Sequence, residues 1–258
     1  MTPPAENDIN DRRTDEQDAA TRAGRAVDWL LVAAALALPS LVTWLYFVAL
    51  AASPPALQQT AYAVGKGLQF ALPLAWVLLV QRRRPRFRAP TPREAFMGLA
   101  SGALIAAAMA ALYLGWLKPA GLFDRAIEPI LAKVSGIGID SGWKYFAVAI
   151  FYAVVHSLLE EYYWRWCVFG QLQTLAGFWI AAAVSSAGFM AHHVLLLGVY
   201  FGYASWLTWA MSACIAVGGA IWAAMYARRG TLWAPWLSHL AVDAMIFAIG
   251  WEIVGPSL

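Results

Sequence analysis

A short run of the sequence, 156–166 (HSLLEEYYWRW), places polar groups in an apolar and aromatic stretch. On a helix, Glu161 and Arg165 are four residues apart and can pair on one face. Glu160 points about 100° away from that pair, and His156 lies one turn before it on the same face. A carboxylate that its neighbours leave unneutralised can accept a proton from water, which is general-base chemistry.

Two later runs add further groups of the same kind. FMAHH ends in His192 and His193, with His193 four residues after Phe189, and HLAVD places Asp243 four residues after His239. All four histidines of the chain lie in its second half, with Glu160 and Glu161. A charged side chain at the centre of a membrane helix costs about 2.5–3.5 kcal/mol, so this clustering indicates a functional site.

Other polar residues have simpler interpretations. Lys66 is expected early in its helix, where its ammonium group can extend to the membrane surface. Cys167 and Cys214 fall in different helices and are expected to be reduced thiols. His156 and His192 are expected to support the site without acting in it.

The surrounding sequence belongs to a membrane protein. Of the 258 residues 61% are hydrophobic and only 13% are charged, whereas soluble domains carry about 25% charged residues. Apolar runs of roughly 20 residues recur, which suffices for helices to cross a bilayer core of about 30 Å. The sequence therefore predicts an all-α fold, a polytopic transmembrane helical bundle of about seven spans, with eight possible.

The chain is expected to divide into two parts. Residues 1–26 are polar, with six acidic residues and four arginines, and are predicted to be a disordered cytoplasmic tail. Residues 27–258 are predicted to form the helical domain. The spans are expected at 27–52, 57–80, 95–117, 143–170, 176–194, 203–227 and 232–252. The segment 118–142 is too polar to span and is expected to hold a short interfacial helix.

Orientation follows from the arginines. Six of them lie in the short loop 81–93, which is therefore predicted to be cytoplasmic, together with the N-terminus. The loop 118–142 would lie on the opposite side.

EEYYWR, FMAHH and HLAVD, in this order, resemble the three motifs EExxxR, FxxxH and HxxxN/D of the CPBP (Abi) family, which includes the CAAX prenyl endopeptidases. The resemblance covers about residues 143–252. It implies an intramembrane glutamic endopeptidase that uses no metal and no cofactor.

The resemblance also implies residue roles. Glu160 and His193 would activate a water molecule, and His239 with Asp243 would stabilise the oxyanion. Glu161 and Arg165 would hold the helix and the site in shape. From the residues alone, Asp243 can donate a hydrogen bond only when protonated, and otherwise it would orient His239.

Two alternatives stay open. The four residues Glu160, His193, His239 and Asp243 could bind zinc through nitrogen and oxygen atoms, although the sequence has no HExxH. Intramembrane carboxylates and histidines also build proton relays, so a proton-coupled transporter or a non-enzymatic scaffold is the other alternative.

The expected substrate is a membrane-anchored protein or peptide, cleaved for tail processing, maturation or sorting. The expected partners are this substrate and the lipid bilayer, without nucleic acid, and the oligomeric state is open. Arginines outnumber lysines 14 to 4, which favours a GC-rich bacterial genome and hence an inner-membrane location.

Overall fold

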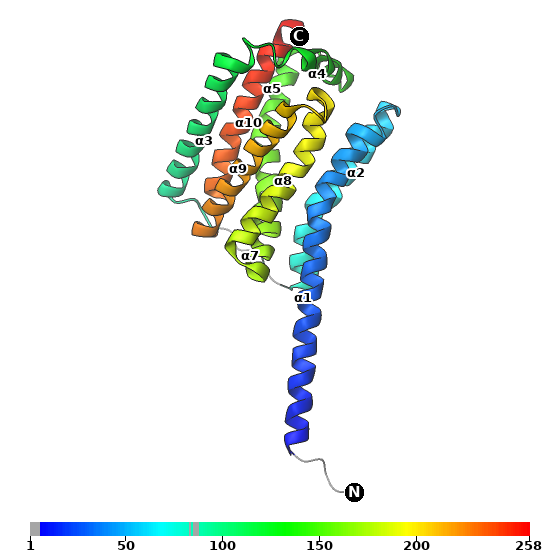
Figure 1. Cartoon of the computed structure of the whole chain (residues 1–258), viewed down its shortest axis with the longest axis vertical. Coiled ribbons are helices and arrows are strands. Elements are labelled where there is room, and N and C mark those ends of the chain that lie inside the picture. The colour runs from blue at the N-terminus through cyan, green and yellow to red at the C-terminus, as the bar shows by residue number, and fades with distance from the viewer. Residues whose placement is uncertain (1–5, 83, 85–87) are drawn as a thin grey trace.

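The computed structural model describes residues 6–82, 84 and 88–258, with side chains described from residue 24 onward. Within this part of the chain the fold is all-α and contains no strand. The α-helices are α1 (Glu6–Trp44), α2 (Pro55–Ala75), α3 (Pro92–Leu112), α4 (Asp124–Gly136), α5 (Gly142–Ile150), α6 (Ser157–Glu161), α7 (Gly170–Ala176), α8 (Phe178–Phe201), α9 (Trp206–Arg229) and α10 (Trp233–Val254). The predicted helical bundle is confirmed (Figure 1).

Among the described residues, seven helical segments are long and apolar enough to cross a membrane, as the sequence predicts. They are Gly24–Ala49, Pro55–Val80, Pro92–Leu117, Gly142–Ala176, Phe178–Phe201, Trp206–Arg229 and Trp233–Ser257. The fifth differs most from its predicted range of 176–194, because α8 continues through the apolar residues up to Phe201. The polar segment 118–142 contains the short helix α4, again as predicted.

The N-terminal helix is longer than its predicted span. α1 begins at Glu6, and its N-terminal part extends well beyond the bundle in Figure 1. Residues 1–5 of the predicted tail lie outside the described residues. The division of the chain at residue 26 stays a prediction.

The fourth span changes its helix type repeatedly. α5 is followed by a π-helical stretch, Phe151–His156, then by α6, and then by a second π-helical stretch, Tyr162–Phe169, which leads into α7. π-helical turns are rare and occur often at functional sites. Here they flank the two adjacent glutamates and change the angular offsets that a regular α-helix would give.

Close packing between α3 and α10 fixes the helix that carries the last motif. A Cβ atom on Gly98 would lie 2.6 Å from the carbonyl oxygen of Ala234, and one on Gly102 would lie 2.8 Å from that of Ser238. Small residues four apart allow helix backbones to approach closely in a membrane. Gly98 and Gly102 thus let α3 pack directly against the backbone of α10. The second of these contacts is at Ser238, the residue before His239.

A buried carboxylate, that of Glu94, stabilises one end of the bundle. We call this carboxylate and its partners the Glu94 clasp (Arg88, Thr91, Glu94 and Thr231). Glu94 is fully buried at the start of α3, and its carboxylate accepts two hydrogen bonds from Arg88, of 2.7 and 2.8 Å. Thr91 forms a capping box with Glu94, and the Thr231 hydroxyl donates to the same carboxylate. The clasp joins the 81–93 loop to the α9–α10 turn.

Candidate active site

The Glu160 side chain is 5% exposed and lies among three imidazoles. Its Oε1 atom is 3.6 Å from Nε2 of His192 and 4.0 Å from Nε2 of His156. Its Oε2 atom is 3.7 Å from Nε2 of His239. No hydrogen bond of 3.5 Å or shorter reaches this carboxylate from the side chains that the structure describes. Glu160 is thus surrounded by polar nitrogens without being bonded to them.

The adjacent Glu161 is held much more firmly. Its side chain is fully buried, Oε2 lies 3.2 Å from Nε of Arg165, and Oε1 lies 2.9 Å from Nδ1 of His239. The ion pair with Arg165 is the one that the spacing predicts. The contact with His239 is additional, so Glu161 links the first motif to the last.

His239 is oriented from both sides of its ring. Its Nδ1–H can donate to Glu161, which directs Nε2 towards Glu160 and towards Oδ1 of Asp243, at 3.5 Å. The indole ring of Trp222 stacks on the imidazole, with 4.0 Å between the ring centroids and 16° between the planes. Trp222 is held in turn by a hydrogen bond from its Nε1 to Ser238.

The two histidines of α8 differ from expectation. His192, expected to support the site without acting in it, is the α8 histidine that approaches Glu160, and it stacks parallel to Trp164 with 5.7 Å between centroids. For His193, no contact of 4.0 Å or less with Glu160 occurs among the described residues. The Nδ1 atom of His193 lies 2.8 Å from the carbonyl oxygen of Phe189, and its ring centroid is 4.1 Å from that of His192.

This hydrogen bond determines how His193 can react. A backbone carbonyl can only accept, so Nδ1 carries the proton and neutral His193 presents a free lone pair on Nε2. His193 is also the more accessible of the two histidines, since His192 is buried. The arrangement suits proton transfer with a water molecule near Glu160.

Arg165 is enclosed by aromatic and backbone groups. Its guanidinium carbon is 4.8 Å from the ring centroid of Phe189 and 5.1 Å from that of Trp222, and Nη2 donates to the carbonyl oxygen of Gly219. Contacts of this kind stabilise a cation by cation–π attraction. Arg165 therefore connects the first motif with α8 and α9.

Sequence reasoning missed Trp222 and Gly219, because α9 carries none of the three motifs. The signal that could have identified α9 is its Gly218–Gly219 pair, which leaves room for a close approach. A Cβ atom on Gly219 would lie 3.2 Å from the hydroxyl of Ser186 and 3.5 Å from Nη2 of Arg165.

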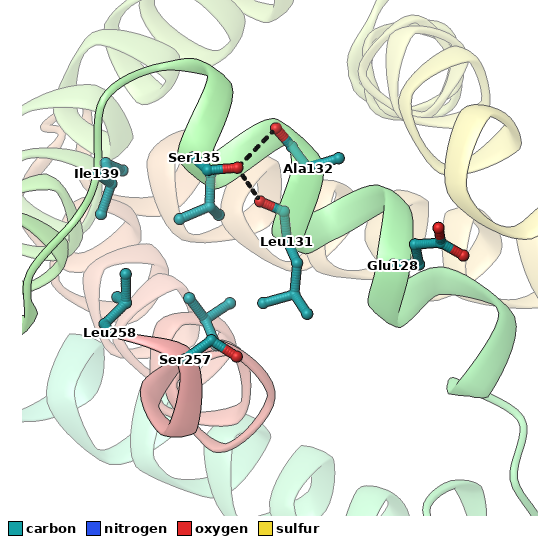
Figure 2. A pocket seen from close by; sticks show the side chains of 9 residues that line it. Glu128, Leu131, Ala132, Ser135, Ile139, Ser257 and Leu258 are labelled. Atoms are coloured by element: carbon teal, nitrogen blue, oxygen red, sulfur yellow. Dashed lines mark hydrogen bonds between the residues drawn. The ribbon is translucent and has the colours of Figure 1, made fainter.

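Two surface hollows of the described residues lie away from this cluster. Figure 2 shows the first, between α4 and the C-terminal turn, where the Ser135 hydroxyl donates to the carbonyl oxygens of Leu131 and Ala132. The second lies between α8 and α9, near Ala182 and Arg228. Neither is lined by a motif glutamate, histidine or aspartate. Within the described part of the chain, no group of three or more His, Cys, Asp or Glu side chains is arranged to hold a metal ion.

Comparison with known protein families identifies the region that holds this cluster. Residues 142–245 match the model of the Rce1-like family, described as type II CAAX prenyl endopeptidase Rce1-like. The matched range contains all three motifs and agrees with the range of about 143–252 expected from sequence.

The Rce1-like match indicates that the chain is a peptidase. The seven apolar helices of the described residues show that it is an integral, multi-pass membrane protein. Comparisons with curated proteins and with solved structures found no match to this chain.

Proposed function

We propose that this Rce1-like protein is a glutamic endopeptidase that hydrolyses a peptide bond in the tail of a membrane-anchored protein or peptide. The observation that carries the proposal is the contrast between adjacent carboxylates. Glu161 is occupied by Arg165 and His239, whereas Glu160 lies among imidazoles at 3.6–4.0 Å and keeps its oxygens available.

In the first step, Glu160 takes a proton from a water molecule, and the water oxygen attacks the carbonyl carbon of the substrate. His193 assists as a second acceptor, since its Nδ1–H bond to the Phe189 carbonyl leaves Nε2 free. Proton transfer by a positioned side chain accelerates such reactions by about 10²–10⁴-fold.

The attack converts the carbonyl oxygen into an oxyanion, which needs nearby donors. We assign this role to His239 in its protonated form, with Nδ1–H bonded to Glu161 and Nε2–H directed to the oxyanion. Asp243, at 3.5 Å from Nε2, orients His239 when ionised and donates when protonated.

In the second step, the carbon–nitrogen bond breaks and Glu160 returns its proton to the leaving amine. Glu161 and Arg165 do not exchange protons with the substrate. They keep His239 and the helix of the first motif in position.

We also propose that the N-terminus is cytoplasmic and that the protein resides in a bacterial inner membrane. The support is the arginine-rich 81–93 loop and the excess of arginine over lysine.

The function can be tested by reconstituting the purified protein into liposomes with membrane-anchored peptides and analysing the products by mass spectrometry. We expect one new carboxyl terminus and one new amino terminus per cleavage, absent with the Glu160→Gln/His239→Ala double variant. Proton flux driven by the peptide, without any cleavage, would instead support the transporter alternative.

A further inference from the structure

Lys66 lies near the middle of the second candidate span, Pro55–Val80, whereas the sequence predicts a position early in its helix. It is 11 residues after Pro55 and 14 before Val80, the ends of that span. At about 1.5 Å per residue, these separations are roughly 16 and 21 Å. For a span centred in a hydrocarbon core of about 30 Å, both surfaces lie farther from the Lys66 backbone than four methylene groups can bridge.

The charge of Lys66 is only partly compensated by its surroundings. Its Nζ atom is 5.7 Å from the ring centroid of Tyr62 and 5.5 Å from that of Phe70. No carboxylate of the described side chains lies within 4.0 Å of it. Cation–π contacts of this kind offset only part of the free-energy cost of a lysine at the centre of a membrane helix.

Aromatic rings connect Lys66 to the candidate active site. The ring centroid of Phe70 is 6.2 Å from that of His156, and Nε2 of His156 is 4.0 Å from Oε1 of Glu160. Tyr152 also lies against His156, with 4.7 Å between the centroids. Lys66 therefore lies on the side of the site next to His156, with the rings of Phe70 and His156 between it and Glu160.

We propose that Lys66 binds the free α-carboxylate at the C-terminus of the substrate, a subsite that depends on the proposed function. A CAAX motif stands at the C-terminus of its protein, so a bond cleaved in such a tail is only a few residues from a free carboxylate. Three or four extended residues span at most about 10–14 Å. A substrate would follow the straight line from Glu160 to Lys66, which is shorter than the stepwise path of 4.0, 6.2 and 5.5 Å through His156 and Phe70.

This subsite would set the position of cleavage. An ammonium group attracts a carboxylate strongly where water is scarce, and Lys66 lacks such a partner in the described structure. An endopeptidase with this contact selects bonds at a fixed distance from a chain end. Internal peptide bonds of a membrane protein would lack the carboxylate and would be poor substrates.

The test uses two membrane-anchored peptides of one sequence, one ending in a carboxylate and one in an amide. We expect the kcat/KM of the wild-type protein to be at least about tenfold higher for the acid than for the amide. A contact that contributes about 1.4 kcal/mol changes the binding constant tenfold. In the Lys66→Met variant, cleavage of the acid should fall to the level of the amide, mainly through KM. Cleavage of the amide should stay unchanged, and Lys66→Arg should restore part of the preference.

Lys144→Met is the matched control, because Lys144 pairs with Asp140 at the start of α5, at 2.7 Å. It should keep the full preference for the acid. Equal cleavage of acid and amide by the wild-type protein would overturn the carboxylate subsite alone, as would an equal loss on both peptides in a folded Lys66→Met variant. If the wild-type protein cleaves neither peptide, the proposed function fails and the subsite fails with it.

Discussion

Two regions of the molecule bury a glutamate, and they treat it differently. In the Glu94 clasp, the carboxylate accepts hydrogen bonds from Arg88, from both the backbone and the hydroxyl of Thr91, and from Thr231. In the candidate active site, the Glu160 carboxylate has imidazole nitrogens at 3.6–4.0 Å and no hydrogen bond within the described structure.

The difference supports the proposal that Glu94 is a structural carboxylate and Glu160 a reactive one. Buried polar groups in proteins are almost always satisfied by partners or by ordered water. Glu94 is satisfied by the protein itself, so it has no capacity left for a substrate or a water molecule. Glu160 retains that capacity, and its neighbour Glu161 takes the structural role by accepting from His239 and pairing with Arg165.

The largest expected effect is the loss of cleavage when histidines around Glu160 are replaced. We expect His193→Ala and His239→Ala each to lower cleavage by about 10²-fold or more, because they remove a proton acceptor and an oxyanion donor. His156→Ala and His192→Ala should be milder. Rates on a membrane-anchored peptide and unfolding midpoints check this, and an equal loss in all four variants would indicate a general folding defect.

The next largest effect is expected for Glu161, which both pairs with Arg165 and holds His239 in position. Glu161→Gln leaves Arg165 buried without its carboxylate, and breaking a buried ion pair costs about 3–5 kcal/mol. It also releases Nδ1 of His239, so activity should fall together with stability. Denaturant titration of the purified variant measures the first loss. A variant that is fully stable and fully active would show that the Glu161 contacts are dispensable.

A smaller effect is expected in the clasp. Glu94→Gln weakens the charged hydrogen bonds of the clasp, in which Arg88 remains partly exposed. We expect the free energy of unfolding to fall by about 1–3 kcal/mol. The cleavage rate of the folded protein should stay at the wild-type value. A large loss of kcat with unchanged stability would contradict the structural role of the clasp.

The smallest effect is expected from chelators. If Glu160 and His193 activate water unaided, EDTA and phenanthroline should leave the cleavage rate unchanged, and elemental analysis should find no stoichiometric zinc. One zinc per chain, with activity lost on chelation and restored by zinc alone, would support the metal alternative while keeping the peptidase function.

The sequence predicts the parts of this arrangement that depend on spacing within one helix. The seven spans follow from apolar runs, and the pair of Glu161 with Arg165 follows from their separation of four residues. The predicted range of the third span begins at residue 95, three residues after the start of α3. The capping-box spacing of Thr91 and Glu94, with Pro92 at the first helical position, is the sequence signal for the true start.

The remainder depends on how separate helices are rotated against each other. The approach of His192 to Glu160, the stacking of Trp222 on His239 and the contact of Glu161 with His239 each join two helices. The π-helical turns beside α6 shift side chains away from the angles of a regular helix, so a helical wheel could not give these contacts.

The most direct test of the central claim compares Glu160→Gln with the wild-type protein in single-substrate kinetics and thermal unfolding. Glutamine keeps the size of the side chain and removes the base, so we predict a fall in kcat of about 10²-fold or more with an unchanged unfolding midpoint. Near-wild-type turnover by folded Glu160→Gln protein would contradict the assignment of Glu160 as the base that activates water.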